Sequence, residues 1–214
     1  MKTKIVLVMA MLVVVLSFGA DKVNAIDYVV ENEHYDQLDL WSGDTLLMNG
    51  GDIWQVNSYD NSESNIHGGV ILQFDTYHTS ILDLFDGGKL NYLDAHNQSD
   101  LCMSGGELLY FNAFDSSTAS LSGGVINNLA ADDESIIDIY GYGFAFDSSG
   151  GSYPGGLFTG FWPDDTTFSI DLFDRNSITY DHIVSHEIPE PGMLSLFLFG
   201  SVGMLRKKRI CMCD

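Results

Sequence analysis

Paired glycines recur through the middle of the chain at a nearly constant interval. The pairs begin at Gly50, Gly68, Gly87, Gly105 and Gly123, so the steps are 18, 19, 18 and 18 residues, and one further step of 18 reaches Gly141. A fixed period near 20 residues indicates one structural unit stacked on copies of itself. The repeats span residues 50–143, and the single longer step is explained by an inserted residue, Asp86.

Apolar residues fall at fixed positions of each unit, counted from the first glycine of the pair. Position 4 holds Ile53, Ile71, Leu90, Leu108 and Ile126, and position 7 holds Val56, Phe74, Leu93, Phe111 and Leu129. Position 9 is small, position 13 is always serine, position 17 is always apolar, and position 15 is apolar in the last four units. Positions 7 and 9, then 15 and 17, alternate with polar neighbours, which is the period of a β-strand. The odd spacing between positions 4 and 7 requires a bend.

These patterns predict an all-β fold, a parallel β-solenoid with coils of about 18 residues. Each coil is expected to hold two longer or three shorter strands separated by turns. Stacking at ~4.8 Å lets each strand pair with its equivalent in the next coil. The glycine pairs permit positive φ at a repeated corner, and the serine hydroxyls can satisfy backbone or neighbouring serine groups in a tight turn. The inserted Asp86 should bulge outward.

The flanks of the repeat predict two atypical ends. Residues 26–49 keep the apolar columns but lack the glycine pair and carry Asp44 in the place of serine, so we expect an incomplete leading coil. After Tyr140 the repeat decays. Residues 157–161 and 167–172 alternate around a turn at Pro163, which predicts a hairpin that caps the last coil. Residues 176–188 predict a short strand and a tether, and we expect one domain over residues 26–188.

The first 25 residues have the three parts of a secretory signal peptide. Lys2 and Lys4 precede an apolar stretch of 14 residues, residues 5–18, and Val23-Asn24-Ala25 fits a small-x-small cleavage site. The apolar stretch is short for a membrane-spanning helix, which needs about 20 residues. We therefore expect export, with signal peptidase cutting after Ala25.

The C-terminus carries a second three-part signal. Pro189-Glu190-Pro191 precedes an apolar run, residues 192–205, for which we expect a transmembrane helix. A basic cluster follows, formed by Arg206, Lys207, Lys208 and Arg209. Such a segment is retained in the inner membrane with its positive end in the cytoplasm.

Residues 189–209 closely resemble the sorting signal of the PEP-CTERM family of exported bacterial proteins. The resemblance implies transient anchoring in the inner membrane and cleavage by an exosortase-like enzyme. The glycine-pair repeat is also similar to short solenoid repeats of that family, over roughly residues 32–188. One departure is the tail that holds Cys211 and Cys213, because these chains usually stop soon after the basic cluster.

Charge excludes one class of partner. The formal net charge is −21, and between residues 26 and 205 the basic residues are Lys89 and Arg175 alone. Nucleic-acid affinity rests on Lys and Arg, so a nucleic-acid partner is not expected. Cys102 falls in an outward position with no partner cysteine in the repeat, so no disulfide framework is implied.

Outward positions supply candidate ligand residues. Asp75 and Asp94 at position 8 and Asp115 at position 11 could hold Ca²⁺, although the nonapeptide signature of calcium-binding β-rolls is absent. Tyr59 and Tyr77 at position 10 could stack on sugar rings. The competing explanations are turn geometry for the aspartates and packing between strands for the aromatic residues.

These expectations favour a non-enzymatic protein of the cell surface or the extracellular matrix, associated with exopolysaccharide and without a cofactor. One alternative is a module that binds glycan or ice. A second is a polysaccharide-acting β-helix enzyme, for which basic residues are scarce. The pair His182 and His186 lacks the helical arrangement of zinc proteases, so no metal site is expected there.

Overall fold

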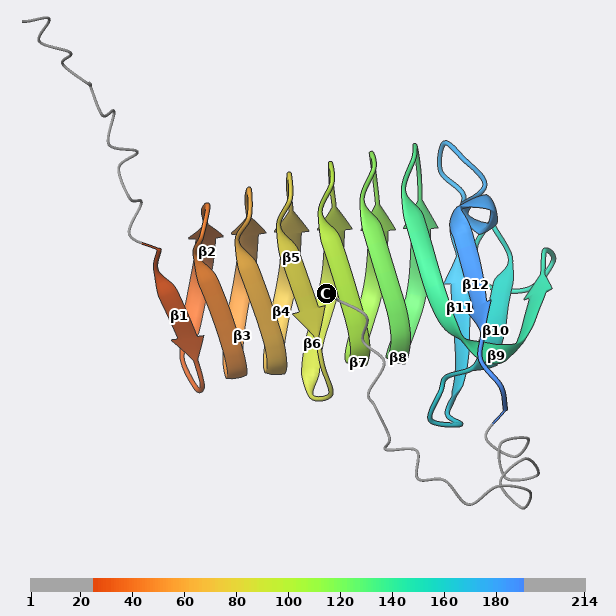
Figure 1. Cartoon of the computed structure of the whole chain (residues 1–214), viewed down its shortest axis with the longest axis horizontal. Coiled ribbons are helices and arrows are strands. Elements are labelled where there is room, and N and C mark those ends of the chain that lie inside the picture. The colour runs from red at the N-terminus through yellow and green to blue at the C-terminus, as the bar shows by residue number, and fades with distance from the viewer. Residues whose placement is uncertain (1–24, 191–214) are drawn as a thin grey trace, which may run out of the picture.

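The structure is a computed structural model that describes residues 25–190, and over this range the chain is a parallel β-solenoid (Figure 1). Twelve strands join one sheet, accompanied in this range by one short 3₁₀ helix. The strands of the coils are β1 (Asp27–Val30), β2 (His34–Leu40), β3 (Thr45–Ser58), β4 (Glu63–Thr76), β5 (Ile81–Leu84), β6 (Gly88–Ala95), β7 (Asp100–Ala113), β8 (Thr118–Ala131) and β9 (Ile136–Asp147). The C-terminal end adds β10 (Leu157–Phe161), β11 (Thr167–Leu172), η1 (Thr179–His182) and β12 (Ile183–Glu187). The predicted fold class is confirmed.

Successive coils pair in parallel with the register that the repeat predicts. In β3 and β4, Ile53 lies opposite Ile71 and Val56 opposite Phe74. The division of the coil into strands differs from the prediction, because β3, β4, β7 and β8 each run for 14 residues through the glycine pair. The bend is a register shift inside the strand, between Met48 and Asp52 in β3.

The glycine pair has a steric cause. Gly106 has φ +79°, and a Cβ on it would lie 2.7 Å from the carbonyl oxygens of Gly88 and Phe85 in the preceding coil. A residue with a side chain would therefore meet both a strained backbone and the neighbouring coil. Close stacking of the coils at this corner thus requires glycine.

The coil with the inserted residue is the exception. Its strand is split into β5 and β6, and Asp86 lies exposed in the turn between them. In Figure 1 this turn extends beyond the matching corners of the neighbouring coils. The outward bulge predicted at Asp86 is confirmed.

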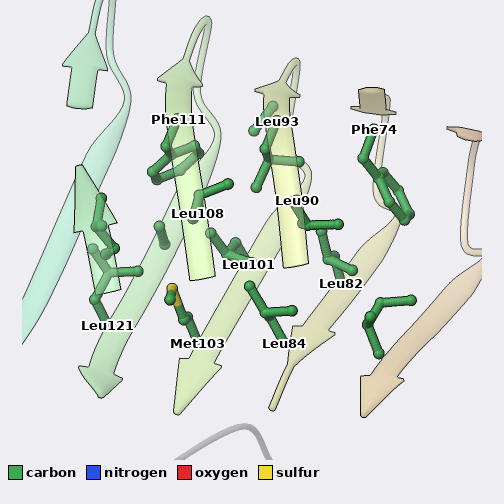
Figure 2. Packing of buried hydrophobic residues seen from close by; sticks show 14 of the residues in the cluster. Phe74, Leu82, Leu84, Leu90, Leu93, Leu101, Met103, Leu108, Phe111 and Leu121 are labelled. Atoms are coloured by element: carbon green, nitrogen blue, oxygen red, sulfur yellow. The ribbon is translucent and has the colours of Figure 1, made fainter. Parts of the chain in front are cut away.

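Stacked apolar columns fill the interior. Every residue at positions 4, 7 and 17 of the five repeats is at most 2% exposed. Figure 2 shows Leu90 and Leu108, Leu93 and Phe111, and Leu84 and Met103 side by side in neighbouring coils. Burying one such side chain stabilises the fold by about 1.5–3 kcal/mol. Each added coil buries several of them and so adds several such contributions to stability.

The serine column closes the turn after each long strand. Ser62, Ser80, Ser99, Ser117 and Ser135 are all buried. Ser62 and Ser135 donate to the carbonyl oxygens three residues earlier, both at 2.8 Å, and Thr76 donates to Ser99 of the next coil at 2.9 Å. These contacts confirm the predicted role for Ser62, Ser99 and Ser135, whereas the buried hydroxyl of Ser117 has no hydrogen-bond partner among residues 25–190.

The leading coil is incomplete, as predicted. Strands β1 and β2 both pair with β3 in parallel. Asp44 is buried and accepts the backbone N–H groups of Ile26 at 2.8 Å and Trp41 at 2.9 Å. The carboxylate therefore anchors the first strand in a place where a serine hydroxyl is too short to serve both groups.

The C-terminal end is the predicted hairpin cap. Strand β10 pairs antiparallel with both β11 and β9, β11 returns to β8 in parallel, and β12 adds to β9. Trp162 and Phe158 are at most 1% exposed and close the interior. The short strand predicted within residues 176–188 is β12.

Two expectations fall wholly or mainly outside the described residues, namely the signal peptide and the apolar run 192–205. Within residues 25–190 no helix is long and apolar enough to cross a membrane.

Candidate functional site

One outward column consists of stacked rings, and we name it the aromatic column: Trp41, Tyr59, Tyr77, His96 and Phe114. Consecutive ring centroids lie 4.5, 5.0, 4.9 and 4.9 Å apart, with interplanar angles of at most 15°. The guanidinium of Arg175 lies 5.5 Å from the ring of Phe114 and covers the end of the column. Each inner ring therefore has both faces occupied by its neighbours.

This stacking bears on Tyr59 and Tyr77 as candidate glycan contacts. Burial raises the pKa of both phenols, and nearby aspartates add to the effect. Since the ring faces are taken, only ring edges and hydroxyls remain for a ligand. Packing between coils accounts for these residues without one, and their role in glycan binding stays a prediction.

A second outward column is polar, and we name it the amide–carboxylate column: Asp39, Asn57, Asp75, Asp94 and Asn112. Asn57 donates to Asp39 at 2.7 Å, and Asn112 donates to Asp94 at 2.5 Å. Asp75 accepts from Gln73 at 2.9 Å and Gln55 at 3.3 Å.

Asp75 and Asp94 lie opposite each other in adjacent coils with no amide between them. Burial raises the pKa of Asp75, and the charge of Asp94 raises it further. The structure thus brings together two of the three aspartates that the sequence nominated.

The third aspartate, Asp115, belongs to the turn column: Asp60, His78, Asn97, Asp115 and Asp133. All five have φ between 56° and 60°, a region that Asp and Asn tolerate better than most residues. Asp115 accepts the backbone N–H of Asn97 at 2.8 Å, and Asp133 accepts that of Asp115 at 3.2 Å. Turn geometry and bonding between coils therefore explain this column.

Metal-binding geometry is absent from the part of the chain that the structure describes. No group of three His, Cys, Asp or Glu side chains there could hold an ion. His182 contacts the carbonyl of Ser135 at 2.9 Å, and His186 contacts Asp138 at 2.5 Å and stacks on Tyr140 at 4.5 Å. The two histidines thus have separate structural partners. Cys102 lies in the outward column as predicted but is only 6% exposed.

Two residues of the predicted sorting motif fall within the described range. Pro189 and Glu190 are exposed just after β12, and the backbone N–H of Ile188 donates to Gly141 at 2.8 Å. The motif therefore begins at the surface of the cap. Pro191 and the basic cluster 206–209 lie outside the described residues.

Sequence reasoning missed a groove of about 360 Å³ at the glycine corner, beside the cap. It is lined by Asp86, Lys89, Glu107, Val125, Asp164 and Thr166, together with glycines of three coils. The one available signal was the coincidence of the inserted residue with the single lysine of the repeats.

Comparison with known proteins adds no assignment, because no protein-family model, no curated protein and no solved structure matches this chain.

Proposed function

We propose that this chain is an exported, non-enzymatic structural protein of the cell surface or extracellular matrix, delivered through a PEP-CTERM-like signal. Its solenoid of about six coils would serve as a stiff acidic rod of roughly 30 Å among extracellular polysaccharide. Signal peptidase would remove residues 1–25, and an exosortase-like enzyme would act on the anchor that starts at Pro189.

The observation that carries this proposal is the use of outward side chains for contacts between coils. The aromatic column, the amide–carboxylate column and the turn column each link successive coils along the rod. Side chains already committed to neighbours hold the coils in register and resist bending. Such a surface suits a load-bearing or space-filling element better than an active site, whose groups must be available to a substrate.

The two cations of the described residues favour the same view. The ammonium of Lys89 contacts both carboxylate oxygens of Glu107 at 2.8 Å, and Arg175 lies over Phe114 and Phe173. Each of these two side chains therefore already has a partner within the protein.

The sorting step is tested by replacing Pro189, Glu190 and Pro191 with alanine in the full chain, in a bacterium that processes such signals. We expect the parent chain to lose both termini and to leave the inner membrane, and the variant to remain there with its C-terminal segment attached. Intact-mass analysis after cell fractionation measures both cuts. The matched control is Pro163→Ala, which changes an exposed proline of the cap loop.

Equal processing of the parent and the triple variant would reject the sorting motif. A parent chain that keeps its C-terminal segment in the membrane would instead identify a permanent anchor. Retention of residues 1–25 would reject export through a cleaved signal peptide.

A further inference from the structure

The groove at the glycine corner is bounded on one side by the solenoid and on the other by the cap loop of residues 162–167. Its volume of about 360 Å³ falls at the lower end of small-molecule sites, about 300–1,000 Å³. It therefore suits a small unit, or one unit of a longer chain that lies along the rod.

The floor of the groove is flat because glycine forms it. Gly88, Gly106 and Gly124 line it from three successive coils. Gly106 and Gly124 have positive φ and are glycine for the packing reason given above, whereas a Cβ on Gly88 would meet the side chains of Leu84 and Ile66 at 2.7 and 2.8 Å. Val125 adds an apolar side chain that is 55% exposed. A ligand ring can therefore approach the backbone closely and place its C–H groups against Val125.

The wall of the groove is held in place by the cap loop. The indole N–H of Trp162 donates to the carbonyl of Gly124 at 2.8 Å. Asp164 accepts the backbone N–H of Thr166 at 3.0 Å and its hydroxyl at 2.6 Å. The loop is thus fixed to the coil that forms the floor, and its polar groups are preorganised.

The opposite end of the groove is where the repeat is broken. The insertion of Asp86 splits the strand into β5 and β6, and Lys89, the one lysine of the described residues, follows three residues later. Stacking alone requires neither residue, because the other coils lack both. Departures from an otherwise consistent pattern are expected at functional sites.

The charges of the groove select the ligand. Three carboxylates, those of Asp86, Glu107 and Asp164, face one ammonium that is already paired with Glu107. An anionic ligand would meet net repulsion. A metal ion is not favoured, since no three acidic or histidine side chains in residues 25–190 are grouped for coordination. Carboxylates are strong acceptors for hydroxyl donors. The Lys89 ammonium can donate, and the Thr166 hydroxyl, which donates to Asp164, can accept.

We propose that this groove binds an uncharged sugar unit, with its hydroxyls bonded to Asp86 and Asp164 and its apolar face on the glycine floor. The inference does not depend on export or on the C-terminal signal, because it uses only side chains of the solenoid and its cap. It also differs from the aromatic column as a glycan site. The aromatic column follows the C-terminal ends of the strands, whereas the groove lies at their glycine corner, and the inner rings of the column are stacked on both faces.

The test is calorimetric titration of the full chain with maltohexaose, cellohexaose and a mannose hexasaccharide, and with glucose and mannose as monosaccharides. An oligogalacturonate of the same length serves as the charged comparator. We expect saturable binding of at least one neutral hexasaccharide and weaker or no binding of the oligogalacturonate. A monosaccharide that binds as tightly as its hexasaccharide would indicate a free-sugar site, and a tighter hexasaccharide would indicate a polymer site.

Asp86→Ala should weaken binding about tenfold or more, the effect of losing a hydrogen bond to a charged group. Thr166→Ala should weaken it less. Glu63→Gln, at an exposed position outside the groove, should leave it unchanged, and circular dichroism checks that each variant is folded. The proposal is overturned if no neutral sugar binds, if Asp86→Ala and Glu63→Gln bind alike, or if the oligogalacturonate binds more tightly.

Discussion

Asp132 connects the last complete coil to the cap, and its removal should release the end of the chain. The residue is 1% exposed. One carboxylate oxygen accepts the backbone N–H groups of Asn176 at 3.1 Å and Ser177 at 3.0 Å, and the Ser177 hydroxyl at 2.9 Å. Asp132→Ala would leave both backbone donors without this acceptor.

The expected cost follows from these contacts. A hydrogen bond to a charged group contributes about 1.5–3 kcal/mol, and a buried donor left unpaired costs about 1–3 kcal/mol. Asn176 is exposed, so water replaces part of its bond, and Ser177 also donates to the carbonyl of Ala131 at 2.7 Å. We therefore expect about 2–4 kcal/mol of local destabilisation, confined to the cap because the inner coils do not use Asp132.

Hydrogen exchange measures this loss directly. Amides of residues 176–187 should exchange about thirtyfold to a thousandfold faster in Asp132→Ala, while those of β4 and β7 keep their rates. Asp132→Asn retains an acceptor oxygen in the same place and should have a much smaller effect. Glu134→Ala, a nearby exposed control, should be within about 0.5 kcal/mol of the parent. Unchanged cap exchange in Asp132→Ala, or equal acceleration in the inner coils, would refute the reasoning.

Three further predictions concern the coils. Asp75→Asn should stabilise the protein by about 0.5–1.5 kcal/mol at pH 7. The pKa of Asp75 is raised in the folded state, so the parent protein loses stability as pH rises through that pKa. Urea unfolding should therefore show a smaller stability difference between variant and parent at acidic pH. Gly106→Ala should lower the free energy of unfolding by about 2–4 kcal/mol, and Gly43→Ala should lower it clearly less. Both glycines have positive φ, but a Cβ would lie 2.7 Å from its nearest atom at Gly106 and 3.6 Å from it at Gly43. Thermal unfolding of the two variants measures the difference. Hydrogen bonds raise the pKa of His34, the larger effect coming from Asp52 and the smaller from Asp36. The protection of β2 amides from hydrogen exchange should therefore be full below the ordinary pKa of histidine and should decline as pH rises through the raised pKa. Exchange rates measured against pH test this.

The solenoid could be predicted from the sequence because an apolar residue recurs at each inward position in coil after coil. The period, the parallel register and the buried columns follow from residues that repeat in several coils. The bulge at Asp86 follows from the one break in that repeat. The continuous 14-residue strand was not predicted, because a glycine pair is equally consistent with a turn and with a bend inside a strand. The groove could not be predicted either, since it needs the cap loop to fold back beside the coils, and that contact joins residues far apart in the chain.

Three aspartates show what the repeat leaves to individual residues. Asp44 replaces a serine and anchors the first strand, Asp132 replaces an aromatic residue and anchors the cap, and Asp86 is inserted and opens the groove. In a regular coil the backbone N–H groups are paired with the equivalent residues of the next coil. At an end of the stack, or where the repeat is interrupted, some backbone N–H groups lie out of reach of the residue that usually occupies that position. A carboxylate can accept several such donors at once, which explains Asp44 and Asp132. Asp86 lies within the stack, where coils continue on both sides. Its carboxylate lies against Gly105 of the next coil and lines the groove that we propose to bind a sugar unit.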